Sequence, residues 1–540
     1  RCQVLAGIGE RRGVLRGDIF RVVHGGFMLV VPAHRKLVMD TPSYQQVAAV
    51  IPHAKAFTHG GQNLLALHHG VEESLVLKNF GFSVPAPILS YYDWPARFTA
   101  MDHQKETAAF LTMNKRALVL NAPGTGKTIS SIWAADFLLT EGIAKKVLIV
   151  APLSTLTVVW AREIRHHLPH RGFVVVTGDR ERRERMMAAT GVQYYIINHD
   201  GFTHNHAMFK DFDVVIYDEA TALKSPSSQR YKLFAKWVAA KDPWLWMLTG
   251  TPISQTPADA WTLARLVNSP NCPKSYTTFK DMVMQKITTF RWTPRPDALE
   301  TCRKVLQPSI RFSLNECKDL PDTNYVGRKA ELTPQQKKAF KEMQEKAVTF
   351  FSGTEVAAPN AAVVLGKMLQ ICCGVVYSDD TRVEIDASDR YNTFTELIDE
   401  IGGKVIVFCP LRGVQDWLYE SLKKGGYDVA TVHGGVGKAE RNQIFNDFQH
   451  TDSIRVLLAH PKVAAHGLTL TRSQDIVWFA PIYSLEQYEQ ANARIRRLST
   501  VGKTTVWHIY ATSFEAELYR RLRQKQRVLG EFLNLVQGIN

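Results

Sequence analysis

The stretch LVLNAPGTGKTISS (Leu118–Ser131) decides the fold. An apolar run, Ala117–Leu120, leads into a glycine-rich turn, and a segment with helical periodicity follows from Ile129. A buried strand, a loop of this composition and a helix together predict a phosphate-binding loop at the end of a parallel strand. Gly124 and Gly126 would let the backbone approach a triphosphate, toward which the N–H groups of the helix N-terminus would point.

Two further residues of the loop and a later pair of carboxylates are candidate phosphate-binding, metal-binding and catalytic residues. Lys127 would supply positive charge to the β- and γ-phosphates, and the Thr128 hydroxyl would bind Mg²⁺. VVIYDEAT (Val214–Thr221) ends another buried strand in two carboxylates. Asp218 would hold Mg²⁺, and Glu219 would accept a proton from the attacking water. The two motifs together predict hydrolysis of ATP with Mg²⁺, whereas an Asp-Glu pair alone would indicate only a solvated loop.

Short apolar runs alternate with helix-length segments on both sides of these motifs. This alternation predicts an α/β protein with two RecA-like lobes, each a doubly wound parallel sheet, and with helices between them. The expected strands of the first lobe are Ala117–Leu120, Lys146–Val150, Phe173–Val176, Tyr194–Ile197, Val214–Tyr217 and Leu245–Leu248. Those of the second lobe are Val405–Cys409, Asp428–Val432, Ile454–Ala459, Asp475–Phe479 and Thr504–Ile509.

The ends of the chain differ from these two blocks. Ile19–Val23 and Phe27–Val31 flank a His-Gly-Gly turn and predict a β-hairpin. A Pro- and aromatic-rich strap, Val84–Pro95, follows. The segment Tyr519–Val536 has an amphipathic stripe that we expect to pack on the second lobe. We therefore expect a small α+β domain in residues 1–95, the first lobe with a helical extension in 96–318, and the second lobe with a helical segment and a C-terminal helix in 319–540.

The composition restricts the partners and the compartment. The 540 residues carry a formal net charge of +15, which favours a polyanion such as nucleic acid as the partner. No apolar run is long enough to span a membrane. Seven scattered cysteines without a CxxC motif indicate reduced thiols and no zinc site. The first residue is Arg and no secretory leader follows it, so we expect an intracellular protein, in the cytoplasm of a bacterium or an infected host, or in the nucleus of a eukaryote.

A pair of arginines completes the predicted chemistry. QANARIRRL (Gln490–Leu498) places Arg494 and Arg497 three residues apart, on one face of a helix. Two guanidinium groups that project together can neutralise the charge that develops on the γ-phosphoryl group. A basic surface helix would show the same spacing.

In their order along the chain, these motifs resemble the superfamily-two helicase-like ATPases of the Snf type, the class that drives chromatin remodellers and fork-remodelling translocases. The resemblance extends from Phe98 to Leu522. The segments that carry it, in chain order, are MDHQKETAAFL, NAPGTGKT, APLSTLTVVWARE, DEATALKS, LTGTPI, IRFSLNECKDLP, VIVFCPL, TVHGGVGKAERNQIFNDF, AAHGLTLT and QANARIRRL.

The resemblance implies a role for each matching position. The ATP-binding residues would be Gln104, which reads adenine, with Gly124, Thr125, Gly126, Lys127 and Thr128. Hydrolysis would depend on Lys127, Asp218, Glu219, Gln490, Arg494 and Arg497, and the metal ligands would be Thr128 and Asp218. Coupling between the sites would involve Thr249, Gly250 and Thr251. DNA would be held by Ser154, Thr155, Asn198, Gly434, Gly467 and Thr469.

The implied activity is ATP-driven movement along double-stranded DNA, with remodelling of branched DNA or of DNA–protein complexes by fork regression, branch migration or annealing. Two alternatives stay open. One is a helicase that separates strands of DNA or RNA, and the other is a protein that binds DNA structures and uses ATP as a switch.

Three departures from the family pattern indicate a compact viral or bacterial branch. Asn121 stands where the family has Asp, so the loop should close without an ionic anchor. Thr221 replaces the His of the acidic box, and Arg496 stands where His is usual. The N-terminal hairpin and its strap resemble the HARP-type substrate domain of annealing helicases, and a β-rich cap that stabilises the first lobe is the alternative.

Overall fold

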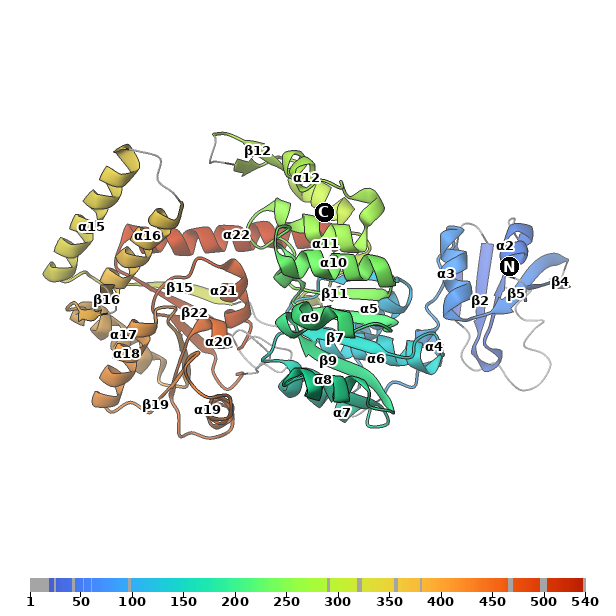
Figure 1. Cartoon of the computed structure of the whole chain (residues 1–540), viewed down its shortest axis with the longest axis horizontal. Coiled ribbons are helices and arrows are strands. Elements are labelled where there is room, and N and C mark those ends of the chain that lie inside the picture. The colour runs from blue at the N-terminus through green and yellow to red at the C-terminus, as the bar shows by residue number, and fades with distance from the viewer. Residues whose placement is uncertain are drawn as a thin grey trace.

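The computed structural model describes residues 19–23, 26–40, 44–51, 53–59, 61–95, 99–288, 292–317, 323–353, 358–378, 381–464, 470–495 and 503–537. Three bodies follow one another along the chain: a small antiparallel sheet with two helices, and two parallel sheets with their helices (Figure 1). The α/β class and the two doubly wound lobes predicted from the sequence are confirmed. We call the two larger bodies lobe 1 and lobe 2.

The small N-terminal body contains the predicted hairpin. Ile19 pairs with Val30 at the start of an antiparallel ladder, and the turn residues His24 and Gly25 lie outside the described residues. Apolar side chains of the sheet and of both helices form one core. In the order β1-β2-β3-β5-β4, the strands are β1 (Ile19–Val23), β2 (Gly26–Val31), β3 (Lys36–Met39), β5 (Gln62–His68) and β4 (Lys55–His59), and the helices are α2 (Tyr44–Val50) and α3 (Val71–Asn79).

Lobe 1 has a seven-stranded parallel sheet covered on both faces. Val147 and Ile149 pack with α5, α6 and α7, whereas Leu148 and Val150 pack with α9, α10 and α11, as alternation along a central strand requires. The strand order is β14 (Ser309–Ile310), β6 (Arg116–Val119), β11 (Trp244–Leu248), β10 (Val214–Asp218), β7 (Val147–Ala151), β9 (Val192–Asn198) and β8 (Gly172–Val175). The helices are α5 (Asp102–Thr112), α6 (Lys127–Thr140), α7 (Arg162–His167), α8 (Arg180–Met187), α9 (His199–Asn205), α10 (Gln229–Lys241) and α11 (Ala260–Val267).

All six strands predicted for lobe 1 are present. The seventh, β14, was not predicted, because two residues carry no periodicity. A helical and hairpin extension precedes it, made of α12 (Tyr276–Val283), β12 (Met284–Lys286), β13 (Trp292–Pro294) and α13 (Ala298–Val305).

Lobe 2 has a six-stranded parallel sheet. Its five predicted strands are present, and the edge strand β15 was missed because its half-exposed residues form no apolar run. The strand order is β15 (Asn324–Lys329), β22 (Thr505–Tyr510), β21 (Asp475–Trp478), β18 (Val405–Phe408), β20 (Val456–Ala459) and β19 (Val429–Val432). The helices are α17 (Ser388–Ile401), α18 (Arg412–Lys424), α19 (Lys438–His450), α20 (Pro461–Ala464), α21 (Leu485–Asn492) and α22 (Ser513–Gln537), and β15 is followed by α15 (Pro334–Gly353), α16 (Ala358–Cys372), β16 (Val375–Ser378) and β17 (Thr381–Glu384).

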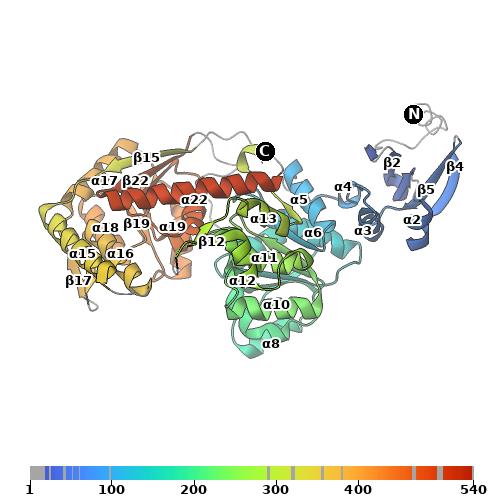
Figure 2. The same cartoon turned by 90° about the horizontal axis from the view of Figure 1, so that it is seen from above.

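The C-terminal helix α22 crosses from lobe 2 to lobe 1 (Figures 1 and 2). In its first half Tyr519 stacks on His508, and its hydroxyl donates to the backbone oxygen of Trp478. In its second half the helix packs against α13, and Lys525 donates to Gln255 of lobe 1. The prediction that this stripe packs on lobe 2 therefore holds only for its first half.

The N-terminal body docks on lobe 1 through apolar and polar contacts, and Val71 and Leu75 of α3 pack with the lobe 1 core. The guanidinium of Arg35 forms a bidentate ion pair with Glu141, which follows α6. Lys78 donates to the backbone oxygen of Met113 and to the side-chain oxygen of Asn114. Among the described residues no helix has the length and hydrophobicity that a membrane crossing requires, and the six described cysteines are free thiols.

Candidate active site

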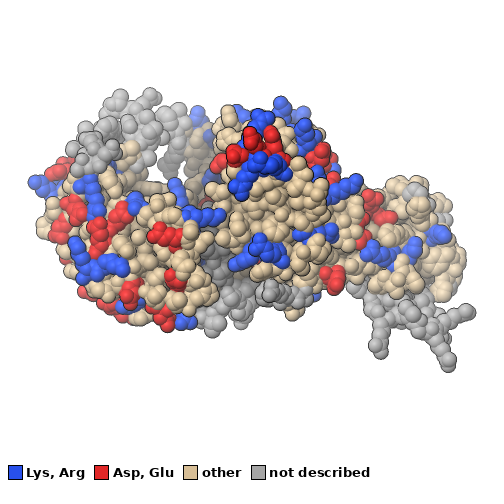
Figure 3. Space-filling view, turned by 60° about the horizontal axis from the view of Figure 1, so that its bottom comes forward, with Lys and Arg blue, Asp and Glu red and all other residues tan. Residues whose placement is uncertain are grey.

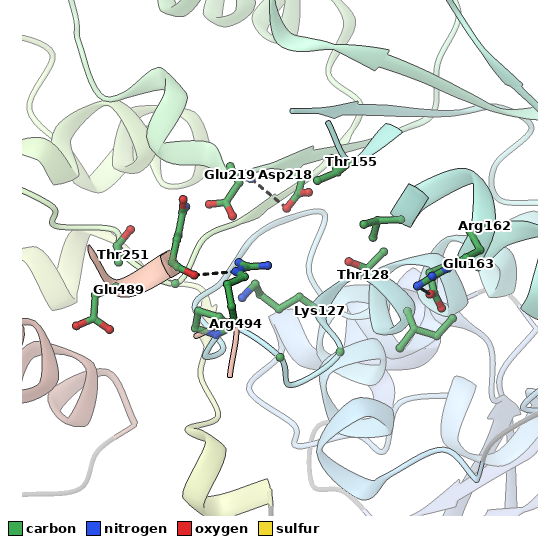
Figure 4. A pocket seen from close by; sticks show the side chains of 17 residues that line it. Lys127, Thr128, Thr155, Arg162, Glu163, Asp218, Glu219, Thr251, Glu489 and Arg494 are labelled. Carbon is green, nitrogen blue, oxygen red and sulfur yellow. Dashed lines mark hydrogen bonds and ion pairs between the residues drawn. The ribbon is translucent and has the colours of Figure 1, made fainter. Parts of the chain in front are cut away.

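A cavity of about 270 Å³ lies between the carboxyl ends of the lobe 1 strands and helix α21 of lobe 2 (Figure 4). Loops that follow β6, β7, β10 and β11 form one side, which is where ligands bind in open parallel sheets. From lobe 1, the cavity is lined by Gly124, Gly126, Lys127, Thr128, Thr155, Asp218, Glu219, Gly250 and Thr251, among others. From lobe 2 it is lined by Glu489, Gln490 and Arg494.

The phosphate-binding loop has the backbone that its glycines allow. Gly124 has φ 88° and Gly126 has φ 91°, a left-handed conformation that L residues rarely adopt. A Cβ on Gly126 would also lie 2.3 Å from the side-chain nitrogen of Gln104. Nζ of Lys127 donates to the backbone oxygens of Asn121 at 2.8 Å and Ala122 at 3.2 Å, so the ammonium is held over the mouth of its own loop.

Gln104 lies behind this loop and not in the cavity. Its Oε1 accepts a hydrogen bond from the N–H of Met101 at 3.2 Å, and its Nε2 donates to the backbone oxygen of Thr125 at 3.4 Å. The adjacent His103 contacts the same oxygen through Nε2 at 2.8 Å. In this arrangement Gln104 braces the loop, and the residue is not among those that line the cavity.

The acidic pair sits at the end of β10 and is oriented by neighbours. Oδ1 of Asp218 accepts from the N–H of Glu219 at 3.1 Å, and Oδ2 accepts from Nε1 of Trp160 at 3.1 Å. His199 donates from Nε2 to the backbone oxygen of Asp218 at 2.9 Å. Trp160 is delivered by a π-helical turn, η2 (Leu156–Ala161), a distortion often found at functional sites.

Burial shifts both carboxyl groups. Burial raises the pKa of Asp218, although the hydrogen bond from Trp160 and the charge of Lys127 oppose the shift. Burial and the neighbouring Asp218 carboxylate raise the pKa of Glu219 to about 7. A carboxyl group with a pKa near neutrality is suited to accept a proton at physiological pH. Glu219 also has φ 50°, an uncommon backbone conformation for a residue other than glycine.

Lobe 2 contributes a further cation to the cavity. Arg494 is 5% exposed, and its Nε donates to the backbone oxygen of Gln490 at 2.8 Å. Figure 4 shows its guanidinium beside the Lys127 side chain, reaching in from the opposite lobe. Lys127, Arg494 and the N-terminus of α6 therefore converge in one cavity, an arrangement that fits a polyphosphate.

The residues present also fit a magnesium ion. The Thr128 hydroxyl and the Asp218 carboxylate both line the cavity. Both supply oxygen ligands of the kind that Mg²⁺ prefers, and such sites usually complete the shell with water and substrate phosphates. When bound, Mg²⁺ would neutralise part of the phosphate charge.

The segment after β11 contacts the phosphate-binding loop. Gly250 faces Pro123, whose Cδ would lie 3.3 Å from an added Cβ. The buried Thr249 hydroxyl oxygen accepts from the N–H of Thr251 at 3.1 Å, and Thr251 lines the cavity. These three predicted coupling residues therefore connect β11 to the nucleotide side of lobe 1.

The residues predicted to hold DNA come from both lobes, and in lobe 1 Asn198 ends β9 where it pairs with Ala151 of β7, three residues before Ser154. Ser154 and Gly434 are exposed, and Asn198 is half-buried at the start of α9. Thr155, also predicted to hold DNA, is 5% exposed and lines the nucleotide cavity, and its hydroxyl donates to the backbone oxygen of Pro152. Gly467, Thr469 and Arg497 lie outside the described residues.

Several residues around the cavity were missed by the sequence reasoning. Arg162 and Glu163 of α7 and Glu489 of α21 line it, and Glu486 contacts lobe 1 from the first turn of α21. Arg162 and Glu163 stand inside a segment that the family resemblance had marked, so position in a motif was the available signal. Glu486 carried no signal, since its partner is 265 residues away in the chain.

Two family models match most of the chain. Residues 103–375 match the model of the SNF2-related domain, and residues 389–499 match that of the helicase conserved C-terminal domain. Protein p41 of Acyrthosiphon pisum secondary endosymbiont phage 1 is 26% identical over 81% of this chain and 98% of its own length. The uncharacterized ATP-dependent helicase YqhH of Bacillus subtilis is 22% identical over 82% of each chain.

Two further matches are a longer relative and a solved structure. The ISWI chromatin-remodeling complex ATPase ISW1 of Saccharomyces cerevisiae is 22% identical over 77% of this chain, which spans 39% of that protein. The solved Sulfolobus solfataricus SWI2/SNF2 ATPase core in complex with dsDNA is 20% identical, covers 83% of this chain and 95% of its own, and has a TM-score of 0.40. At that score the likeness carries no structural detail over to this chain.

Proposed function

This chain belongs to the SNF2-related family of helicase-like ATPases, and we propose that it is an ATP-driven translocase on double-stranded DNA. The observation that supports the proposal most is the two-sided cavity. Lys127, Asp218 and Glu219 enter it from lobe 1, and Gln490 and Arg494 enter it from lobe 2. A nucleotide site divided in this way can couple hydrolysis to relative movement of the lobes.

Each side chain then has a task in hydrolysis. Lys127 and the N-terminus of α6 hold the β- and γ-phosphates. Glu219 accepts the proton of the attacking water, for which its raised pKa is suited. Arg494 neutralises the charge that develops on the γ-phosphoryl group, and it acts only when the lobes are closed. We assign the same task to Arg497.

The net charge and the small residues predicted at the DNA contacts support a duplex partner. The formal charge is +15, and on the face shown in Figure 3 Lys and Arg side chains form separate groups across lobe 1. Contacts to phosphates hold a duplex without reading its sequence, so we expect little sequence preference and a steep loss of affinity as salt rises.

Remodelling of branched DNA is the finer part of the proposal. The N-terminal body contacts lobe 1 through the Arg35–Glu141 pair and Lys78, so a junction bound by this body would be held close to lobe 1. The test is the ATPase rate of the full chain with single-stranded, duplex, forked and four-way DNA. A rate higher with forks or junctions than with duplex of equal length would support the assignment, and equal rates would contradict it.

Two substitutions test the chemistry. Lys127→Ala and, separately, Arg494→Ala should abolish DNA-stimulated ATP hydrolysis. Arg494→Ala should still bind a fluorescent ATP analogue, because the phosphate-binding loop belongs to lobe 1. The matched controls are Lys232→Ala on α10 and Arg180→Ala on α8, both exposed and remote from the cavity. Normal turnover in either cavity variant would contradict the assignment.

The product of the reaction separates this function from its alternatives. A translocase displaces the third strand of a DNA triplex but does not unwind a fork into single strands. Unwinding of DNA or RNA would instead show a strand-separating helicase. Junction binding with no stimulated hydrolysis would show a protein that uses ATP only as a switch.

A further inference from the structure

Glu486 of lobe 2 is bound by the segment of lobe 1 that follows the Asp218–Glu219 pair. We call this segment, residues 220–224, the acidic-box loop. Oγ1 of Thr221 donates to Oε1 of Glu486 at 2.7 Å, and Nζ of Lys224 lies 3.5 Å from Oε2. Thr221 is 3% exposed, and the Glu486 side chain is 21% exposed, so the contact is largely shielded from water. It is a direct polar link between the lobes at the edge of the cavity.

The lobe 1 side of this link is adjacent to the hydrolytic residues. Thr221 follows Glu219 by two positions in the loop after β10. Nζ of Lys224 also donates to Oγ of Ser254 at 3.2 Å, and Ser254 donates to Asp259 at 3.2 Å. The link therefore joins Glu486 to the loop of the carboxylate pair and to the segment that follows Thr251.

On the lobe 2 side, Glu486 lies on α21, the helix that also carries Gln490 into the cavity. Glu486, Gln490 and Arg494 are spaced four residues apart, so they share one face of α21 and of the turn that follows it. The N-cap Ser484 and the position of Glu486 in the first turn both suit this helix start. Holding Glu486 in place therefore holds the position of α21 along its axis and its rotation, and these two set where Arg494 projects.

We propose that Glu486 is a positioning residue for ATP hydrolysis, which holds α21 against the acidic-box loop through Thr221 and Lys224 so that Arg494 reaches the γ-phosphoryl group. This inference rests on the proposed function, since it needs hydrolysis in this cavity. It also accounts for the departure at position 221: a hydroxyl of threonine size donates to a carboxylate that the opposite lobe supplies. Glu486 adds negative charge near Glu219 and so contributes to the raised pKa of that carboxyl.

The test uses variants that separate the hydrogen bond, the charge and the fold. Thr221→Val removes the hydroxyl at nearly constant volume, and Thr221→Ser keeps it. Glu486→Gln keeps an acceptor for Thr221 but loses the charge near Lys224, and Glu486→Ala removes both. Glu440→Ala is the matched control, because Glu440 is an exposed glutamate in the first turn of another lobe 2 helix.

The kinetic result expected is a fall in kcat without a change in nucleotide affinity. Misplacing a catalytic group by about 1 Å costs up to roughly a hundredfold, so Glu486→Ala and Thr221→Val should lower kcat by about tenfold or more. Thr221→Ser should restore the rate, and Glu486→Gln should lie between. The double variant Glu486→Ala/Thr221→Val should be no slower than the slower single variant, because the two side chains act as one unit.

A second readout does not require hydrolysis. Dyes introduced at the exposed positions Lys241 of lobe 1 and Lys424 of lobe 2 report the distance between the lobes by energy transfer. Glu486→Ala and Thr221→Val should both broaden the distribution of distances, and Glu440→Ala should not. If the wild-type chain failed to hydrolyse ATP while Glu486→Ala and Thr221→Val still broadened the distribution, the proposed function would be wrong and the link would stand. Wild-type kcat in Thr221→Val, or additive losses in the double variant, would overturn the inference.

Discussion

Nδ2 of Asn121 donates a hydrogen bond to Oγ1 of Thr107 at 2.9 Å, which joins the phosphate-binding loop to helix α5. The Thr107 hydroxyl donates its own proton to the backbone oxygen of His103 at 2.7 Å, so it can only accept from position 121. Oδ1 of Asn121 accepts from the N–H of Phe312 at 2.9 Å. The loop therefore closes on two neutral hydrogen bonds, where the family pattern would place a charge.

Replacing this amide by a carboxylate should destabilise lobe 1. In Asn121→Asp an ionised carboxylate would be buried at a site where the wild-type residue is 1% exposed, and its oxygen would face the lone pairs of Thr107. Burial would raise the folded-state pKa of the new carboxyl above its unfolded value, so the variant keeps its stability at low pH and loses it as pH rises. We expect a loss of about 1–3 kcal/mol at pH 8.

Thermal unfolding of Asn121→Asp at about pH 4, close to the unfolded-state pKa of an aspartate, and at pH 8, each against the wild type, measures this loss. Asn271→Asp, at an exposed position of lobe 1, is the control. A deficit that is equal at the two pH values would contradict the explanation by burial of charge.

The indole of Trp160 should matter for the use of Mg²⁺. Its Nε1 donates to Oδ2 of Asp218, and partners that orient a metal ligand typically contribute 10–100-fold to metal affinity or activity. Trp160→Phe should therefore raise the Mg²⁺ concentration for half-maximal ATPase rate by about tenfold. Trp246→Phe is the matched control, because that indole is equally buried in lobe 1 and donates to the backbone oxygen of Asn114. A similar Mg²⁺ requirement in both variants would show that Trp160 only packs.

An ion pair in the core of lobe 2 should be costly to break from one side. Arg390 and Glu515 are both fully buried, with 2.9 Å between Nη2 and Oε1. Glu515→Ala would leave the guanidinium without its counter-charge, and we expect a loss of about 3–5 kcal/mol in stability. The double variant Arg390→Met/Glu515→Leu should lose less, because no buried charge remains. Denaturant unfolding followed by far-ultraviolet circular dichroism gives the ranking, and a double variant less stable than Glu515→Ala would contradict it.

The features that could be predicted from the sequence are those that leave a pattern in neighbouring residues. The central strands were predicted because burial on both faces makes apolar runs such as Val147–Val150. Edge strands such as β15 were missed because half their residues are exposed. Cavity residues on the lobe 1 loops were predicted because each lies next to such a strand, and a loop at a strand end has a known place in the sheet.

Contacts between distant segments were not predictable. No feature of the sequence near Glu486 indicates that Thr221 donates a hydrogen bond to it. Likewise, no feature near Trp160 indicates that its indole contacts Asp218. Such contacts depend on how separate segments pack, and a single sequence carries no local signal of that.

The ion pair between Arg35 and Glu141 should contribute to the docking of the N-terminal body on lobe 1. Arg35→Glu would place two carboxylates together and should weaken docking, whereas Arg35→Glu/Glu141→Arg should restore it. The Arg35 side chain is 43% exposed, so the pair is worth only about 1 kcal/mol. Hydrogen exchange of α3 and of α4 (Ile88–Tyr91) reports docking, and faster exchange in the single variant should return to the wild-type rate in the swapped pair. Faster exchange that persists in the swapped pair would show a different cause.

A buried histidine should make lobe 2 sensitive to acid. Burial lowers the pKa of His508 to about 3, with Arg523 acting in the same direction, so the imidazole is neutral in the folded state. It contacts the hydroxyl of Tyr488 through Nε2 at 2.8 Å and stacks on Tyr519. Because the folded-state pKa is below the unfolded value, the stability from this residue is complete above pH 6.5 and is lost as pH falls toward 3.

One titrating proton changes the free energy of unfolding by about 1.4 kcal/mol per pH unit. Between pH 7 and pH 5 the free energy of unfolding of His508→Gln should therefore fall less steeply with pH than that of the wild type, by up to this amount per pH unit. At pH 7 the variant itself should be less stable by about 1–3 kcal/mol, because the stacked ring is gone. Denaturant unfolding at pH 5, 6 and 7 separates the two effects. The exposed His450→Gln is the control, and equal slopes for His508→Gln and the wild type would show that another group causes the sensitivity to acid.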